Sequence, residues 1–448
     1  MRTQNRKFVP GAVLLLQAAV AVAQPLQYLK TVTVTAPSEG VSARPEVALT
    51  AERAFVLYLA IATGNERTFT LRIYDRDFEH LLATRVLVST TPDYGGPTDI
   101  RIATDGQYLY AFYETHKPTS PNTAATYLWG AKYALDDAFE RVAYTSTPVA
   151  TSRPMAQLPE GGELLDDPAP LIGPASVFVV TRLKYSLSMS GRTIYRVREL
   201  RKDNLAQLGQ FDLDLSDAAN GRARVNSLLL WNNSILMALS TTVSDVGINE
   251  NTDDGAKSDV ILVRMRPDWT FDPKADVRTL SAEPDDVENY VCGLEADADY
   301  VYVTYKQSVG QPPAGEHRAW IKMFDRNFKL VHQEKVRTTV WGPSGGELRP
   351  SLEVMDRQVL SGQSTGEPFG AGSAKVFVYQ RRPGVPGDLN CDGAVNNFDI
   401  DPFVLALTDP AGYVQKFPDC DRMLADVNGD GVVDNFDIDP FVKLLTLP

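Results

Sequence analysis

The sequence predicts a mainly β protein in which a six-bladed β-propeller is followed by a small α-helical module at the C-terminus. Three observations predict this fold class. The residues between 24 and 382 repeat one strand pattern six times, and a lone strand-like run at 29–35 precedes the first repeat. A 12-residue acidic motif then occurs twice near the C-terminus, with its two copies 38 positions apart.

The composition is that of an acidic globular protein. The chain has 448 residues, with 44 Lys and Arg against 57 Asp and Glu, and a formal net charge of −13. This balance argues against nucleic-acid binding, because neutralising phosphates requires clustered basic side chains. The four histidines are scattered without metal-ligand spacing, which argues against a zinc site built from histidine.

Residues 1–23 have the pattern of a signal peptide. Three basic residues precede an apolar stretch at 8–23, which ends in Ala21-Val22-Ala23, the small-x-small pattern that a signal peptidase cleaves. The alternative is a membrane anchor, but this stretch of about 16 residues is shorter than the roughly 20 that span a bilayer. We therefore expect cleavage before Gln24 and export, either into the medium or to the cell surface, with no membrane span.

The body of the chain, residues 24–382, reads as six four-stranded units. Each unit begins with a short run, a polar turn and a second run rich in β-branched and aromatic residues. These segments are 45–58, 98–113, 167–181, 225–239, 290–305 and 349–363. A second hairpin follows each of the first five, and four strands about every 60 residues is typical of a propeller blade. An array of sandwich domains is the alternative, but about 60 residues is short for a sandwich.

The first and last strand-like runs of residues 24–382 are expected to form the sixth blade together. The sixth unit has a third strand at 375–379 and then stops at the Pro- and Gly-rich stretch 383–387, which we interpret as a linker. The lone run at 29–35 supplies the missing fourth strand if it pairs beside Tyr379. Such pairing closes the ring and removes two exposed sheet edges.

The innermost strands of a propeller converge on its axial mouth, where ligands bind. Polar residues at or just before these strands form an acid-leaning rim suited to hydroxyl-rich ligands, such as a glycan, or to cations. The candidate ligand-binding residues are Glu46, Asp99, Asp167, Asn226, Asn289, Glu347 and Arg349. The alternative is that polar residues at strand starts simply face water.

No catalytic residues can be assigned from the sequence. Glycoside hydrolysis needs two carboxylates about 5–10 Å apart. Glu163, Asp166, Asp167 and Glu347 are available, but nothing fixes their geometry. The Ser-x-Asp-x-Gly-x-x-Trp turns of six-bladed sialidases do not occur, and neither does a nucleophile elbow, a phosphate loop or a zinc-protease motif.

The duplicated acidic motif has the ligand spacing of a calcium loop. A calcium ion takes six to eight oxygens, which a 12-residue loop supplies from positions 1, 3, 5, 7, 9 and 12. In the first copy these positions are Asp388, Asn390, Asp392, Ala394, Asn396 and Asp399. In the second copy they are Asp426, Asn428, Asp430, Val432, Asp434 and Asp437.

Other features of the motif favour the same interpretation. Position 6 is Gly393 or Gly431, where the sharp turn needs a residue without a Cβ atom. A single copy could be an Asx-rich turn, but two copies that match at every ligand position favour two bound Ca2+ ions. Because the acidic side chains repel one another without metal, folding of this module should depend on calcium.

Paired loops with Asp at position 12, each leading into an apolar helix, resemble the type I dockerin module. The resemblance covers residues 388–448 and implies two loop–helix units packed antiparallel around two calcium ions. It further implies docking to a cohesin-like or cell-surface protein through loop positions 10 and 11. Here these positions are Asn397-Phe398 and Asn435-Phe436, where the family commonly has small hydroxyl residues. The alternative for the two phenylalanines is packing between the units.

Two cysteines of this region, Cys391 and Cys420, are candidates for a disulfide, because an exported protein folds in an oxidising compartment. The third, Cys292, lies inside an apolar strand pattern. Together these features suggest a secreted, non-catalytic binding or scaffold protein, whose propeller binds a ligand and whose calcium module attaches to a partner. The alternative is an extracellular polysaccharide-acting enzyme, a glycoside hydrolase or lyase, because dockerin-type modules often accompany such enzymes.

Overall fold

The computed structural model describes residues 26–446 with internal gaps. The gaps are 36–40, 62–65, 118–124, 137–138, 146, 154–161, 185–192, 219–221, 243–257, 281–286, 310–315, 341–349, 366–372, 382–384, 393, 418–419, 421 and 431. The chain divides into two compact units, one of which is Leu26–Arg381 while the other contains Arg382–Pro448. The predicted signal peptide lies outside the described residues.

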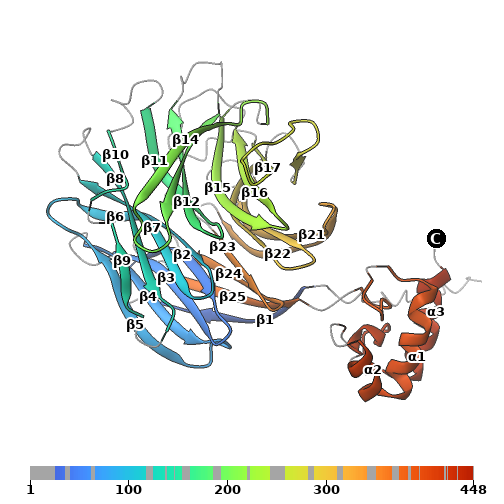
Figure 1. Cartoon of the computed structure of the whole chain (residues 1–448). Coiled ribbons are helices and arrows are strands. Elements are labelled where there is room, and N and C mark those ends of the chain that lie inside the picture. Colours follow the sequence, from blue (N-terminus) through green and yellow to red (C-terminus); the bar gives the residue numbers. More distant parts are fainter. Residues whose placement is uncertain are drawn as a thin grey trace, which may run out of the picture. The chain divides into compact units, whose positions relative to one another are not determined.

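The larger unit is a six-bladed β-propeller, as the sequence predicts (Figure 1). Its first three blades follow one another along the chain, and in each the strand that comes first in the chain lies innermost. Blade 1 contains β2 (Val41–Leu49), β3 (Arg53–Ile61), β4 (Arg67–Asp75) and β5 (Leu81–Ser89). Blade 2 contains β6 (Gly96–Thr104), β7 (Tyr108–Lys117) and β8 (Ala125–Ala134), and both β9 (Arg141–Tyr144) and β10 (Ala150–Ser152) pair with β8. Blade 3 contains β11 (Gly162–Ile172), β12 (Ser176–Lys184), β13 (Ile194–Arg201) and β14 (Gln207–Asp214).

The remaining three blades keep the same order, except that the last blade takes its outer strand from the start of the chain. Blade 4 contains β15 (Arg222–Trp231), β16 (Ser234–Thr242), β17 (Ser258–Met265) and β18 (Val277–Thr279). Blade 5 contains β19 (Val287–Ala296), β20 (Val301–Val309), β21 (Glu316–Phe324) and β22 (Leu330–Val340). Blade 6 contains β23 (Ser351–Met355), β24 (Gln358–Thr365), β25 (Ser373–Arg381) and β1 (Leu26–Thr33).

The innermost strands form a closed ring. Strands β2, β6, β11, β15, β19 and β23 contact one another in that order, and β23 returns to β2. The ring is completed at the chain ends, where β1 runs antiparallel to β25 with Leu26 opposite Arg381 and Thr33 opposite Lys375. The predicted pairing beside Tyr379 is confirmed, with Tyr28 as the opposite residue.

A wedge residue packs each of the first five blades against the blade before it. The turn between the third and fourth strands places a large apolar residue at positive φ, a conformation that is costly for such side chains. These residues are Phe78, Phe139, Leu205, Trp269 and Phe328. Their rings reach the previous blade: Phe139 lies 5.8 Å from Phe55, and Trp269 lies 5.4 Å from Phe178. Burial at the blade interface offsets the backbone cost.

The joint between blades 5 and 6 has no such turn, because the fourth strand of blade 6 comes from the N-terminus. Here Arg381 takes the position between the blades. Its side chain is 8% exposed and its Nε lies 2.9 Å from Oδ2 of Asp297. The guanidinium also lies 5.1 Å from the ring of Tyr300, and Leu26 packs into the same apolar cluster as Tyr302.

The C-terminal unit contains three short helices, α1 (Ile400–Thr408), α2 (Pro410–Lys416) and α3 (Ile438–Thr446). Helices α1 and α3 follow the two acidic loops through the 3-10 turns η3 (Asn397–Asp399) and η5 (Asn435–Asp437), and a third such turn, η4 (Arg422–Ala425), precedes the second loop. The two repeats meet through Phe403 and Phe441, whose rings stack with centroids 4.0 Å apart. Because these residues occupy equivalent positions, the unit has internal twofold character.

The predicted disulfide between Cys391 and Cys420 is confirmed, with Cα atoms 5.9 Å apart. Cys391 has a φ of +55°, and the matching position of the second loop is Gly429 with a φ of +76°. Both loops therefore need a left-handed residue here, which glycine adopts readily. Cys292 lies in β19, although its side chain is outside the described part. Among the described residues, no helix combines the length and apolarity that crossing a membrane requires.

Candidate functional site

The propeller encloses a cavity of about 230 Å³ on its axis, lined by residues from all six innermost strands. Most of the lining residues are apolar in type, but the surface that they expose to the cavity is mainly polar. The charged side chains that line it are Glu46, Arg101, Glu295 and Glu353. They come from β2, β6, β19 and β23, which belong to four consecutive blades around the ring (blades 5, 6, 1 and 2).

Bulges in the innermost strands decide which residues face this cavity. The pairing of the first and second strands shifts register in blades 1 to 5, for example between Pro97 and Ile100 and between Val225 and Ser227. A bulge leaves a residue unpaired and re-aims the side chains beyond it. The predicted rim residues Asp99, Asp167 and Asn226 fall within these bulges, and Glu46 follows one directly.

Glu46 and Arg101 form an ion pair at the cavity wall. Nη1 of Arg101 lies 2.5 Å from Oε1 of Glu46, and the two side chains are only 8% and 11% exposed. A charge-assisted contact between enclosed groups is strong and holds both side chains in fixed positions. The pair therefore gives the cavity one rigid, polar wall.

Glu295 and Glu353 form the second charged element of the cavity. Burial raises the pKa of Glu353 to about 8, and the nearby carboxylate of Glu46 adds to the shift, although a 3.3 Å hydrogen bond donated by Leu49 N opposes it. Burial also raises the pKa of Glu295 well above its ordinary value, with the Glu353 carboxylate as the second cause. Because two coupled carboxyls of this kind cannot both ionise easily, the pair retains a proton at neutral pH.

The sequence-predicted rim residues have different outcomes. Glu46 lines the cavity as expected. Asp99 lies in β6 and is partly buried, outside the cavity lining. Asp167, Asn226 and Asn289 lie on β11, β15 and β19, but their side chains, like that of Asp166, are outside the described part. Glu347 and Arg349 lie outside the described residues altogether.

Sequence reasoning did not predict three of the cavity residues, which are Arg101, Glu295 and Glu353. Each is a charged residue between two apolar neighbours in an inner strand, as in Ile100-Arg101-Ile102 and Leu352-Glu353-Val354. A charge flanked by apolar residues within a strand is expensive to bury. A charged residue between apolar neighbours in an inner strand is therefore the sequence feature that could have indicated these cavity residues.

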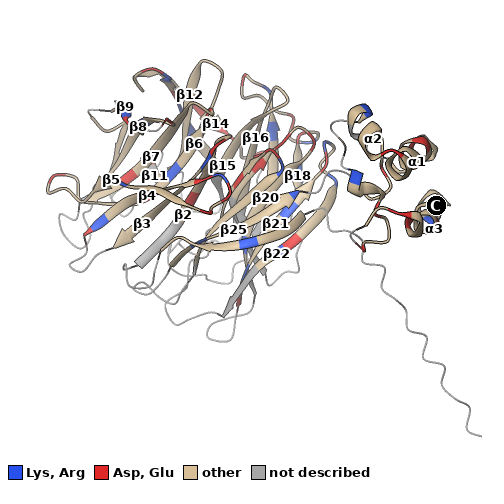
Figure 2. Cartoon of the chain, turned by 90° about the horizontal axis from the view of Figure 1, so that it is seen from below, with Lys and Arg blue, Asp and Glu red and all other residues tan. Residues whose placement is uncertain are grey.

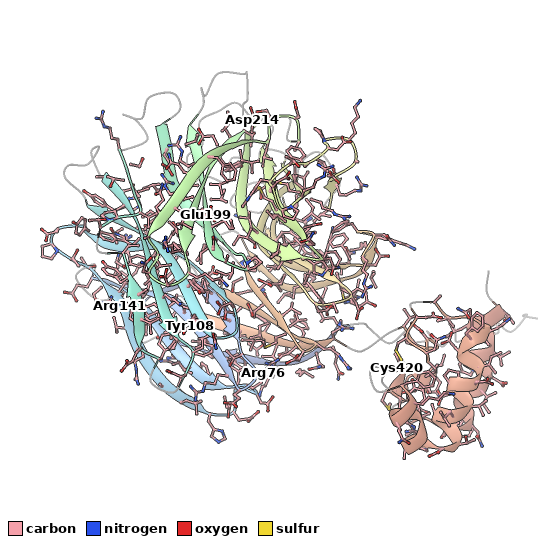
Figure 3. The ribbon with its side chains drawn as sticks, in the orientation of Figure 1. Arg76, Tyr108, Arg141, Glu199, Asp214 and Cys420 are labelled. Atoms are coloured by element: carbon pink, nitrogen blue, oxygen red, sulfur yellow. A yellow bond between two sulfur atoms is a disulfide. The ribbon has the colours of Figure 1, made fainter. Side chains whose placement is uncertain are left out.

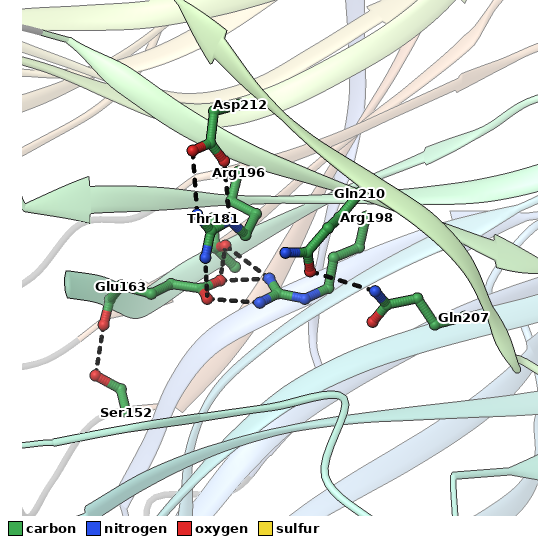
Figure 4. A network of polar contacts seen from close by, with 8 residues as sticks. All are labelled: Ser152, Glu163, Thr181, Arg196, Arg198, Gln207, Gln210 and Asp212. Atoms are coloured by element: carbon green, nitrogen blue, oxygen red, sulfur yellow. Dashed lines mark hydrogen bonds and ion pairs between the residues drawn. The ribbon is translucent and has the colours of Figure 1, made fainter. Parts of the chain in front are cut away.

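Glu163, one of the acids available for catalysis, is committed to structure instead (Figure 4). Its carboxylate accepts hydrogen bonds from Nη1 and Nη2 of Arg198, with Nη2 2.5 Å from Oε2. It also accepts a hydrogen bond from Thr181 Oγ1. Arg196 links this group to Asp212 at 2.9 Å. A carboxylate held on several sides is not free to act as an acid or base.

The two acidic loops of the C-terminal unit have the same internal geometry. In the first, Asp399 Oδ1 accepts hydrogen bonds from Leu389 N and Asn390 N, and its Oδ2 accepts one from Asn396 N at 2.8 Å. In the second, Asp437 accepts the matching bonds from Asn428 N at 3.0 Å and Asp434 N at 2.9 Å. The position-12 carboxylate thus closes each loop onto positions 3 and 9.

The other oxygen atoms of the two loops are carboxylate, amide and carbonyl oxygens, which are the ligand types that a calcium ion takes. The carboxylates at positions 1 and 12 are buried, with Asp388 2% and Asp399 0% exposed, whereas those at position 5, Asp392 and Asp430, are exposed. Figure 2 shows acidic segments in red beside α1 and α3. Among the described residues, no three His, Cys, Asp or Glu side chains already converge on one point. The fit therefore rests on the donor set. The position-5 carboxylates already face into their loops, where Asp392 accepts hydrogen bonds from Asn390 Nδ2 and Ala394 N and Asp430 accepts the matching ones from Asn428 Nδ2 and Val432 N.

The phenylalanines at loop position 11 do not pack between the repeats. Phe398 is 77% exposed and Phe436 is 78% exposed. Other exposed apolar residues also occur at equivalent positions in both repeats, among them Ile400 with Ile438 and Val404 with Val442. The alternative of packing between the units is therefore wrong for these two rings, and an exposed apolar surface is repeated on both halves of the unit.

No protein-family model matches the chain, and no curated protein matches it in sequence. Among solved structures, a protein of unknown function from Dyadobacter fermentans is similar over 80% of this chain and 100% of its own, with a TM-score of 0.54 and 11% identity. The GH93 α-L-arabinofuranosidase of Fusarium graminearum is similar over 78% and 97%, with a TM-score of 0.49 and 12% identity. The sialidase of Trypanosoma rangeli is similar over 79% and 59%, with a TM-score of 0.44 and 10% identity. At such identities the first likeness supports the fold alone, and the other two carry no argument.

Proposed function

We propose that this is an exported two-part protein. Its propeller binds a glycan in the axial cavity, and its C-terminal unit, a dockerin-like module loaded with two Ca2+ ions, attaches it to a cohesin-like or cell-surface protein. The observation that carries the glycan assignment is the convergence of the Glu46–Arg101 ion pair and the Glu295–Glu353 couple in one cavity.

This mixture of groups suits a ligand rich in hydroxyls. An ionised carboxylate accepts hydrogen bonds, a protonated carboxyl and a guanidinium donate them, and a sugar hydroxyl does both. The cavity of about 230 Å³ is smaller than the roughly 300–1,000 Å³ of pockets for drug-sized ligands. It therefore suits a single sugar unit, such as the end of a chain, better than an extended segment.

The glycan assignment is tested by measuring binding of soluble oligosaccharides to the full chain by calorimetry, at saturating calcium. We expect Glu353→Gln to weaken the dissociation constant at least tenfold, because a neutral amide no longer shares a proton with Glu295. Glu79→Gln is the matched control, since this carboxylate is 64% exposed on the surface. Equal affinity in both variants and the native protein would remove the axial cavity from the proposal.

The calcium assignment follows from the two matching loops. Asp388, Asn390, Asp392, Asn396 and Asp399, with the carbonyl of Ala394, would hold one ion, and the equivalent residues of the second loop would hold the other. Bound calcium would neutralise the repulsion among these side chains, so we expect chelation to unfold this unit. The propeller should be unaffected, because no such ligand set occurs upstream.

Tryptophan fluorescence separates the two units, because all five tryptophans of the chain lie upstream of residue 383. Chelation should abolish the far-ultraviolet signal of the short helices and leave the tryptophan melting transition within about 2 °C. A tryptophan transition that shifts as much as the helical signal would contradict independent units. Calorimetric titration of Ca2+ into the native protein should release or absorb heat, and Asp388→Ala and Asp426→Ala should each reduce it. No heat with the native protein would contradict the calcium assignment.

The attachment role is supported by the exposed rings of Phe398 and Phe436. We expect calcium-dependent binding of the full chain to an immobilised type I cohesin domain, weakened more than tenfold by the double variant Phe398→Ala, Phe436→Ala. Tyr28→Ala removes a 51% exposed ring from the propeller and should leave this binding unchanged. Binding without calcium, or binding that ignores both phenylalanines, argues against attachment through this surface.

A polysaccharide-acting enzyme is the second candidate, and the Glu295–Glu353 couple is the observation that favours it. Glycosidases use one carboxyl as acid and a second carboxylate as base or nucleophile, and environments that set two pKa values apart make such a pair. A polysaccharide panel assayed for released reducing ends or unsaturated products tests this. Turnover that Glu353→Gln abolishes while binding persists would establish catalysis, and binding without turnover in native protein would support the non-catalytic proposal.

A further inference from the structure

A row of aromatic rings lies at the outer margin between blades 1 and 2. Tyr94 contacts both Tyr127 and Trp129 edge to face, with ring centroids 5.0 and 4.8 Å apart. Trp129 in turn stacks almost parallel to Tyr144, at 6.0 Å and 6°. The rings therefore form one continuous set rather than isolated surface residues.

Local structure explains why these rings meet. Tyr127 and Trp129 are two residues apart on β8, so both point to the same face of the blade. Tyr144, on β9, pairs with Ala131 of β8, two residues beyond Trp129. Tyr94 comes from the turn between the two blades, which is closed by paired hydrogen bonds between Thr91 and Gly95. The backbone thus brings the four residues together, and their rings contact one another.

The set combines a buried anchor with exposed faces. Trp129 is 4% exposed and its Nε1 donates a 3.0 Å hydrogen bond to Thr115 Oγ1. Tyr94 and Tyr144 are 37% and 39% exposed. Rigid aromatic rings held on a buried support offer a large amphipathic contact area with little entropy left to lose on binding.

Two arginines flank the rings. The guanidinium of Arg141 lies 4.6 Å from the ring centre of Tyr144, and Figure 3 labels Arg141 on the outer strand β9. The stem of Arg67 lies against Gly96, next to the turn that carries Tyr94. Within the described residues neither arginine forms an ion pair, and the exposed acids nearest in sequence to the rings, Asp93 beside Tyr94 and Glu140 beside Arg141, do not pair with them.

We infer that this surface binds an acidic polysaccharide. We call it the blade-2 platform and define it as Tyr94, Tyr127, Trp129 and Tyr144 with Arg67 and Arg141. Sugar rings have apolar C–H faces that pack on aromatic rings, while a uronate carboxylate pairs with an unneutralised guanidinium. A plain apolar protein surface would not use the two arginines, and a simple anion would not use the tyrosines.

The platform shares no residue with the axial cavity, so it stands apart from the proposed function. The two sites are distinguishable because their variants affect different residues.

The test measures binding of polygalacturonate, as the acidic probe, and dextran, as the neutral probe, to the full chain by affinity electrophoresis and calorimetry at low and moderate salt. We expect polygalacturonate binding in preference to dextran, weakening as salt screens the arginines. Tyr94→Ala should weaken it at least tenfold and Tyr94→Phe should restore it. Arg141→Gln should remove most of the preference for the acidic polymer.

Matched controls are Tyr28→Ala, which removes an exposed ring from β1, and Arg278→Gln, which removes an exposed charge from β18. Both should bind like native protein, and unchanged urea midpoints should show that all variants are folded. Absence of polygalacturonate binding, an equal affinity for dextran, or indifference to Tyr94→Ala each overturns the platform. Loss through Glu353→Gln but not Tyr94→Ala would place the polymer in the cavity, leaving the proposed function standing and this inference wrong.

Discussion

The protonation of the axial glutamates should make the propeller less stable as pH rises, and Glu353→Gln should remove much of this dependence. A carboxyl whose pKa is higher in the folded state than in the unfolded chain holds extra protons when folded. Stability therefore falls with rising pH between the two pKa values. For Glu353 these limits are the ordinary value of 4.5 and about 8.

The magnitude follows from the same two values. One group retaining a full proton changes the free energy of unfolding by about 1.4 kcal/mol per pH unit. Between pH 5 and 8 this gives an upper limit of about 4 kcal/mol, and water in the cavity will reduce it. The glutamine variant can still accept the hydrogen bond from Leu49 N, so we expect it to match native stability within about 1 kcal/mol at pH 5. At pH 8 it should be the more stable protein, because its neutral side chain carries no penalty for ionisation.

Urea unfolding followed by tryptophan fluorescence, at fixed calcium and at pH 5, 6, 7 and 8, measures this directly. The tryptophans report the propeller alone. Glu79→Gln serves as the surface control and should keep the native pH dependence. If native stability is flat or rises across this range, or if the Glu353→Gln curve runs parallel to it, the burial argument for the couple is wrong.

Three further perturbations test the packing and the module. Trp269→Ala should lower the free energy of unfolding by about 3–5 kcal/mol, because it empties a blade interface, and a urea midpoint within error of native would refute the wedge. Arg381→Met should cost about 1.5–3 kcal/mol, because the 13% exposed Asp297 carboxylate loses its cation and keeps only the hydrogen bonds from Tyr302 OH and two backbone N–H groups. A double-mutant cycle with Asp297→Asn should recover at least 1 kcal/mol. Thiol counting in denaturant without reductant should find one free thiol per chain, and reduction of Cys391–Cys420 should cost the calcium-loaded module about 3–4 kcal/mol without moving the tryptophan transition.

The blades could be located from the sequence because their hairpins are local. Each inner pair of strands is joined by a polar turn, as at Asp105-Gly106, and such turns read directly from residue type. The match between Asp75-Arg-Asp-Phe78 and Asp325-Arg-Asn-Phe328 marked a second turn in the same way. What sequence similarity did not reveal is why the match exists. Each phenylalanine packs against the preceding blade, as Phe328 does against Trp231. These partners are distant in the sequence and come together only when the ring of blades closes.

The cavity was harder to predict because bulges intervene. Counting from strand starts selected Asp99, whereas the register shift between Pro97 and Ile100 carries the inward direction onto Arg101. A bulge interrupts the alternation of side chains along a strand, so Asp99, inside the shift, and Arg101, two positions later and beyond it, are not related by simple alternation. The alternation of polar and apolar residues therefore does not predict which side chains of the innermost strands face the axis. The pairing of the backbone in the structure shows this. The two acidic loops could be proposed as calcium sites residue by residue, because their candidate ligands lie within 12 consecutive positions.

The cost of the axial charges argues that the cavity serves a function. Packing alone does not require carboxyls at Glu295 and Glu353, since glutamine or leucine of similar size would fill the same space without ionisation. Burial makes both carboxyls harder to ionise, so at neutral pH they lower the stability of the fold that contains them. Groups that destabilise a protein yet line its central cavity are characteristic of binding and catalytic sites, where a shifted pKa is part of the task. The pH at which the loss of stability levels off should therefore coincide with the midpoint of the pH dependence of ligand binding, because both report the pKa of this couple in the folded protein.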